Sequence, residues 1–337
     1  MKKIFTFLFL VLNLIVFSQQ IESFETILND KISIRAIELY DNKVWYSGTE
    51  SKFGFVDLKN PQNQKQIKLS EKKLQFRTLA QDENDFYAIN IESPAYFFKI
   101  NKQTLKSEIF NIDSTKTAFY DSFIIQSKNV GLAISDPTED GYPNYFNFYN
   151  SKNYELSNTP KYQKGEAHFA ASNSNVAIYK GVTWIATGGS NSRIFKFSRN
   201  YPLYWEVFNT PFIKGESAGI YSIDFANEKF GIAVGGDYTK QEANVNNIAT
   251  TNDGGETWQI QASGKNAGYM TCVKIKTNSK GKEIISVGDQ HISYSSDFGK
   301  TWKKISDEKG FYVCKWVDKN TVVLAGKDKI SVLKLKF

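Results

Sequence analysis

The sequence predicts an all-β fold, a seven-bladed β-propeller whose last blade is closed by the N-terminal strand. A strand–turn–strand pattern recurs seven times, with starts near residues 34, 76, 120, 167, 220, 269 and 311. The spacing of roughly 42 to 53 residues is typical of a four-stranded propeller blade. No stretch has a sustained apolar period of 3.6 residues, so we expect few helices.

The amino-acid composition is that of a globular protein, and its charge and its His and Cys counts argue against some classes of function. The 337 residues are 41% hydrophobic and 23% charged, which supplies ample core. The net charge is +7, but only four basic residues are Arg and the Lys are scattered, so we expect a solvated surface and no nucleic-acid partner. Two His and two Cys leave little for a metal centre, and we expect no metal and no cofactor.

The first 18 residues have the composition of a secretory signal peptide. A basic start, Met1-Lys2-Lys3, precedes an apolar run of about 14 residues, and a cleavage site follows near Ser18. The run is short for a membrane span. We therefore expect an exported protein, periplasmic or secreted, with residues 19–337 as its propeller, no transmembrane anchor in the mature chain, and a monomeric state.

Each repeat has an aromatic or β-branched start, a polar turn, a strand of small residues and a Gly or Asp exit. The paired strands are expected at 34–37 and 44–48, 76–79 and 86–89, 120–123 and 131–136, 166–169 and 183–189, 220–223 and 231–237, 269–272 and 284–289, and 311–314 and 321–326. The residues after 311 suffice for three strands. Residues 21–28 are predicted to supply the fourth, which would remove an open edge; a lone N-terminal arm is the alternative.

Two segments, 251–258 and 295–302, match the pattern [S/T]-x-D-x-G-x-T-W, and 198–205 is a degenerate copy. The carboxylate in such a turn can accept backbone N–H bonds, and Gly allows the positive φ that the turn needs. We interpret these Asp-boxes as structural hairpin locks, with calcium or substrate binding as the alternative. The residues concerned are Asp253, Gly255, Trp258, Asp297, Gly299 and Trp302.

With these motifs the chain resembles the bacterial exported relatives of the photosystem II stability/assembly factor, a sialidase-type Asp-box (BNR) propeller family. The best-matched stretches are 76–77, 133–137, 165–172, 187–189, 219–222 and 234–238. The resemblance implies a protein-binding role, since the photosynthetic members bind partners during complex assembly. Some exported relatives carry a generic oxidoreductase label, but this chain has no dinucleotide-binding fingerprint, CxxC or haem motif.

Strand-one starts and strand-two exits should converge at one mouth of the channel. These positions supply the candidate binding residues, which are Arg35, Arg77, Asp121, Glu166 and His168 at the starts, Glu50, Glu92, Asp136, Asp237, Tyr238 and Asp289 at the exits, and Arg193 in a loop. Gathered charges would bind a polar or charged ligand. The alternative is a ring of compensating ion pairs between blades. We interpret His168 as a hydrogen-bonded channel residue.

The favoured function is an exported binding or assembly module that presents this mouth to a protein or glycan partner. The first alternative is a sialidase-like glycoside hydrolase, in which Arg35, Arg77 and Arg193 would bind the substrate carboxylate and a Tyr would be the nucleophile. The sialidase Arg-Ile-Pro signature is absent. A redox or lyase enzyme is the other alternative.

Cys272 and Cys314 occupy the same place in adjacent repeats. They should lie on neighbouring innermost strands, close to the distance that a disulfide allows. We favour two free buried thiols, with a disulfide as the alternative.

Overall fold

The structure is a computed structural model that describes residues 20–127, 130–149, 152–154, 158–198 and 201–336. Over these ranges the chain forms 28 strands and no α-helix. No helix in the same ranges is long and apolar enough to cross a membrane. The expected signal peptide lies outside the described residues and stays a prediction.

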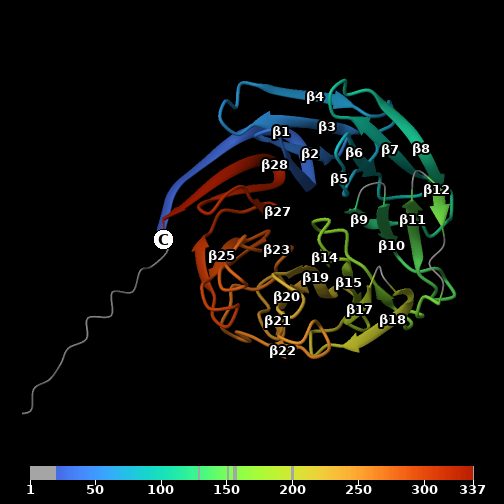
Figure 1. The fold of residues 1–337 in the computed structure, drawn as a ribbon. Coiled ribbons are helices and arrows are strands. Elements are labelled where there is room, and N and C mark those ends of the chain that lie inside the picture. The colour runs from blue at the N-terminus through green and yellow to red at the C-terminus, as the bar shows by residue number, and fades with distance from the viewer. Residues whose placement is uncertain (1–19, 128–129, 150–151, 155–157, 199–200, 337) are drawn as a thin grey trace, which may run out of the picture.

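The strands form a β-propeller, with sheets arranged in a ring around a central axis (Figure 1). Each of four sheets has four strands. They are β5 (Ala80–Gln81), β6 (Asp85–Ile89), β7 (Ala95–Asn101) and β8 (Ser107–Asp113); β9 (Tyr120–Ser127), β10 (Val130–Ser135), β11 (Asn144–Tyr149) and β12 (Lys152–Tyr154); β14 (Val176–Tyr179), β15 (Val182–Ala186), β17 (Arg193–Ser198) and β18 (Tyr201–Asn209); and β23 (Cys272–Ile275), β24 (Ile284–Gly288), β25 (His291–Ser295) and β26 (Lys303–Ser306).

Two larger sheets have six strands each. One has the order β27 (Phe311–Trp316), β28 (Thr321–Lys336), β1 (Gln20–Tyr40), β2 (Lys43–Gly48), β3 (Lys52–Asp57) and β4 (Gln64–Lys68). The other has the order β13 (Glu166–Ala167), β16 (Gly188–Gly189), β19 (Ala218–Phe225), β20 (Gly231–Asp237), β21 (Ile248–Thr251) and β22 (Gln259–Ile260).

The prediction of seven blades is therefore wrong, because the strands form six sheets. The cause is β1, which is 21 residues long. Its first part pairs with β28, as in Leu28 with Ile330, and its last part pairs with β2, as in Ile37 with Tyr46. β1 thus joins the strands of the last repeat and of the first repeat into a single sheet, which contains both the first and the last strand of the described chain.

The repeat pattern arises from the alternation of side chains along each innermost strand. Ile34, Phe76, Ile220 and Phe311 are almost fully buried and pack between sheets, and each is followed by a residue directed to the axis. Aromatic pairs join neighbouring sheets. Trp184 on β15, for example, stacks on Phe225 of β19 with ring centroids 3.8 Å apart.

The hairpin turns at 251–258 and 295–302 share one hydrogen-bond pattern. Asp253 Oδ1 accepts from Thr257 N at 3.0 Å, and Asp297 Oδ1 accepts from Thr301 N at 2.9 Å. Gly255 and Gly299 have φ of +91° and +77°, and Trp258 Nε1 and Trp302 Nε1 donate to their carbonyls at 3.0 and 2.9 Å. The degenerate copy at 198–205 lies partly outside the described residues.

Cys272 and Cys314 lie on β23 and β27, and both are fully buried free thiols. Their Sγ atoms are 3.9 Å apart, whereas a disulfide needs about 2.05 Å. The pair of free thiols that the sequence favoured is the state in this structure.

Candidate functional site

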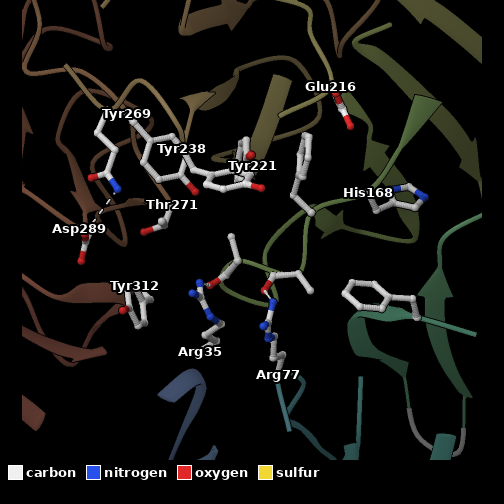
Figure 2. A pocket seen from close by; sticks show the side chains of 15 residues that line it. Arg35, Arg77, His168, Glu216, Tyr221, Tyr238, Tyr269, Thr271, Asp289 and Tyr312 are labelled. Atoms are coloured by element: carbon white, nitrogen blue, oxygen red, sulfur yellow. Dashed lines mark hydrogen bonds between the residues drawn. The ribbon is translucent and has the colours of Figure 1, made fainter. Parts of the chain in front are cut away.

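A cavity of about 540 Å³ opens on the axis at the end of the ring where the innermost strands start. Its size is typical of a ligand site. Figure 2 shows the residues that line it, which are Arg35, Arg77, Phe119, His168, Phe169, Ala170, Ala171, Glu216, Tyr221, Tyr238, Gln241, Tyr269, Thr271, Asp289 and Tyr312.

A central segment, residues 170–175, forms the floor of the cavity. Its first residues, Ala170 and Ala171, line this cavity, and the next ones, from Ser172 to Ser174, line a smaller cavity of about 270 Å³ on the other side. The central segment therefore lies between two separate cavities.

Several sheets hold the central segment in place. The Asn173 amide donates to Leu79 O at 2.8 Å and accepts from Phe123 N at 2.7 Å. Ser172 Oγ donates to Thr271 O at 2.6 Å on another side of the axis. Because these bonds reach different parts of the ring, we expect the floor to be rigid.

Arg35 and Arg77 lie side by side over this floor (Figure 2). Arg35 NH1 donates to Ala171 O at 3.1 Å, and Arg77 NH1 donates to Ala170 O at 3.5 Å. No carboxylate of the described residues lies within ion-pair distance of either guanidinium. Burial, together with the neighbouring Arg35, lowers the pKa of Arg77 to about 10, so the group is still charged at neutral pH. The two guanidinium groups thus lie together without an ion-pair partner among the described residues, and the carboxylates of Asp121 and Glu92 act on Arg77 only from a greater distance.

Aromatic side chains form the opposite wall. Tyr221 stacks on Phe169 with ring centroids 4.0 Å apart, and Tyr269 meets Tyr221 edge-on at 4.8 Å. The Tyr221 hydroxyl donates to Ser217 O at 2.8 Å, which fixes the ring. Tyr312 contacts Arg35, whose Cζ lies 4.1 Å from the ring centroid.

His168 lines the cavity, but both of its ring nitrogens are engaged. Nδ1 donates to Ala186 O at 3.0 Å, so Nε2 is the acceptor of the Tyr162 hydroxyl at 2.6 Å. The hydroxyl groups of Tyr145 and Tyr162 are also hydrogen-bonded to each other, so Tyr145 extends this buried hydrogen-bond network. Burial lowers the pKa of His168 to about 4, so the ring is neutral at pH 7. This arrangement matches the hydrogen-bonded histidine that we expected.

Two carboxyl groups, the buried Asp121 and the half-buried Asp136, lie near each other, and Asp121 lies near Arg77. Asp136 accepts from His168 N at 3.0 Å, and burial raises its pKa to about 6. Asp121 is fully buried, and neither of its oxygens has a hydrogen-bond partner among the described residues. Burial and then the nearby Asp136 raise the pKa of Asp121 well above its usual range. Neither side chain lines the cavity.

Glu166 and Arg193 form a buried ion pair away from the cavity. Arg193 Nε donates to both oxygens of Glu166, at 2.9 and 3.1 Å. Thr187 Oγ1 and Gln163 N also donate to this carboxylate, at 2.5 and 2.9 Å. A sialidase-like site would need Arg193 beside Arg35 and Arg77, but this ion pair holds it elsewhere.

The cavity therefore brings together five of the predicted site residues, and others have local roles. The five are Arg35, Arg77, His168, Tyr238 and Asp289. Asp237 accepts from Thr239 N in a turn, and Glu50 pairs with the exposed Lys73. Glu92 forms a backbone bridge to Phe119 and does not line the cavity, although its charge acts on Arg77 from a distance.

Sequence reasoning missed Glu216, Gln241, Thr271 and three tyrosines of the wall. Tyr221 and Tyr312 could have been found, because each directly follows the first residue of a repeat start, as Arg35 and Arg77 do. Glu216 lies in a connection with no repeat register. Within the described ranges, no group of three His, Cys, Asp or Glu side chains could hold a metal ion.

Comparison with known proteins assigns the chain to the β-propellers by structure alone. No family model matches the sequence, and no curated protein matches it. Among solved structures it is similar to "YCF48 bound to D1 peptide", with a TM-score of 0.66, 12% identity and coverage of 95% of this chain and 100% of that one. It is also similar to YCF48 from Cyanidioschyzon merolae (TM-score 0.65, 11% identity, 93% and 98% coverage). A third is the structure of the RRP9 WD40 repeats (TM-score 0.64, 10% identity, 95% and 100% coverage).

Proposed function

We propose that this propeller is a binding module that takes a charged segment of a protein partner into the cavity above residues 170–175. The observation that carries the proposal is the pair Arg35 and Arg77, which lie together on the floor without a carboxylate partner among the described residues. Guanidinium groups bind carboxylates through planar, bidentate hydrogen bonds.

The pair favours an anion for an electrostatic reason. Among the described residues, each Arg donates one hydrogen bond, from NH1, to a carbonyl of the central segment. Burial and mutual repulsion disfavour the charged form of Arg77. A bound carboxylate would relieve this repulsion, and it would accept bonds in a site where water competes less.

A solved neighbour supports a protein ligand. One of the YCF48 structures holds a D1 peptide, so a propeller of this shape can bind a peptide. We further propose, from the sequence of residues 1–18 and from the two Asp-x-Gly-x-Thr-Trp turns at 253–258 and 297–302, that the chain is an exported member of the Asp-box propellers.

The test is peptide binding measured by isothermal titration calorimetry. A library of short peptides carrying Asp or Glu should contain binders, and Arg77→Ala should weaken them at least 10-fold, since a charge-assisted bond contributes about 1.5–3 kcal/mol. Lys319→Ala removes the same charge from an exposed site outside the cavity and should leave binding intact. Equal losses in both variants, or no binder in the library, would contradict the proposal.

A further inference from the structure

The lining of the cavity carries both signs of charge. Arg35 and Arg77 reach the carbonyls of the floor. Glu216 is exposed and Asp289 is half-buried, and both line the same cavity. Figure 2 shows Asp289 and Glu216 on opposite sides of the cavity, each apart from the Arg pair. With His168 neutral, the formal charges of the lining residues balance, with the two Arg on the floor and the two acids at separate points of the rim.

The acids of the rim lack cationic partners within the part of the chain that the structure describes. Asp289 Oδ2 accepts from the neutral amides of Gln290 at 2.9 Å and Gln241 at 3.5 Å. No Lys, Arg or His nitrogen of the described residues lies within ion-pair distance of Glu216 or Asp289. Like the two Arg of the floor, the two acids of the rim therefore have no ion-pair partner among the described residues.

Aromatic rings lie between the floor and the rim. Tyr238 is 52% exposed and follows the exit of β20, so it presents its ring to solvent at the opening. Tyr312 already holds the Arg35 guanidinium over its ring. The face of an aromatic ring attracts cations. These rings therefore add to the preference of the rim for a positive group.

We propose, on the basis of the function proposed above, that the preferred ligand is a zwitterionic peptide segment. Its carboxylate binds Arg35 and Arg77 at the floor, and a Lys or Arg side chain close in sequence binds Asp289 at the rim. A purely acidic segment would be attracted by the floor and repelled by the rim. Discrimination by such repulsion is a common source of binding specificity.

The experiment compares acetylated and amidated peptides with one, two or three Gly between the charged residues. At each spacing the first peptide carries Glu and Lys, the second Glu and Gln, and the third Gln and Lys. Titration calorimetry with the full chain should show at least 10-fold tighter binding of the Glu/Lys peptide than of the Glu/Gln peptide at the best spacing. In Asp289→Asn this ratio should fall below about 3-fold, the loss expected when the charge that binds the cation is removed.

Glu25→Gln is the matched control, because Glu25 is exposed on β1 and does not line the cavity. It should retain the full ratio. If Glu/Gln peptides bind as tightly as Glu/Lys peptides at every spacing, the zwitterion proposal is wrong and the anion-binding function stands. If the Gln/Lys peptides bind as well as the Glu/Lys peptides, or if no Glu peptide binds, the proposed function itself fails.

Discussion

Breaking the Glu166–Arg193 pair should destabilise the fold and spare binding. The side chains are 0% and 11% exposed, and the carboxylate accepts from a guanidinium, a hydroxyl and a backbone N–H. Glu166→Gln would leave a buried guanidinium without its counterion, and Arg193→Met would leave a buried carboxylate. Removing one partner of a buried ion pair costs about 3–5 kcal/mol.

This energy converts to a measurable shift of the melting temperature. Unfolding entropy is about 2.1 cal/mol/K per residue, so a chain of this length should lose roughly 4–7 °C for a loss of that size. The double variant Glu166→Gln/Arg193→Met removes both charges. It should lose clearly less than the two single variants together, because no unpaired charge is left in the interior.

Thermal unfolding followed by circular dichroism measures these shifts. Peptide affinity measured well below the melting temperature reports on the cavity separately. The expected result is a lower melting temperature with unchanged affinity in each variant. An unchanged melting temperature with lost binding would show that Glu166 and Arg193 belong to the site, as the repeat pattern first predicted.

Three further predictions concern other groups. Asp253→Ala and Asp297→Ala should each lower the free energy of unfolding in urea by about 1–2 kcal/mol, because each carboxylate accepts hydrogen bonds across its turn. Burial disfavours the charged form of the Asp253 and Asp297 carboxylates, but their hydrogen bonds lower both pKa values. The stability that these carboxylates contribute should therefore be lost as the pH falls below about 4. Asp121→Asn should stabilise the protein at pH 7 to 8. The pKa of Asp121 is raised in the fold, so the wild type loses stability as the pH rises above about 4, and the difference in melting temperature should grow over that range. Unreduced protein should have the mass of the dithiol form, with Cys272 and Cys314 both free; a mass about 2 Da lower would contradict this.

Much of the cavity could be predicted from strand alternation. The residue after each buried start points to the axis, which places Arg35, Arg77, Tyr221 and Tyr312 around one cavity. The third repeat has Asp121 at this position, yet Asp121 is buried beside Asp136 and does not line the cavity. Register predicts the direction of a side chain, whereas its depth depends on neighbours from other repeats.

The floor and the sheet count could not be predicted in the same way. The central segment has the sequence Ala-Ala-Ser-Asn-Ser-Asn, which has neither strand alternation nor a helical period. Its position is decided by hydrogen bonds to Leu79, Phe123 and Thr271, which are distant in sequence. The count of six sheets depends on the continuity of β1, which the repeat pattern divides between two blades.

The ion-pair interpretation of the charged mouth describes Arg193, whereas the binding interpretation concerns Arg35 and Arg77 and stays a proposal. Arg193 has Glu166 within hydrogen-bond distance, so its charge is compensated inside the protein and its role is structural. Arg35 and Arg77 donate hydrogen bonds to the carbonyls of Ala171 and Ala170, which offer partial charge, and form no ion pair with any described residue. A carbonyl orients a guanidinium but does not neutralise it. The central segment therefore both blocks the axis and keeps two positive charges available to a ligand, which an ion pair in the same place would have cancelled.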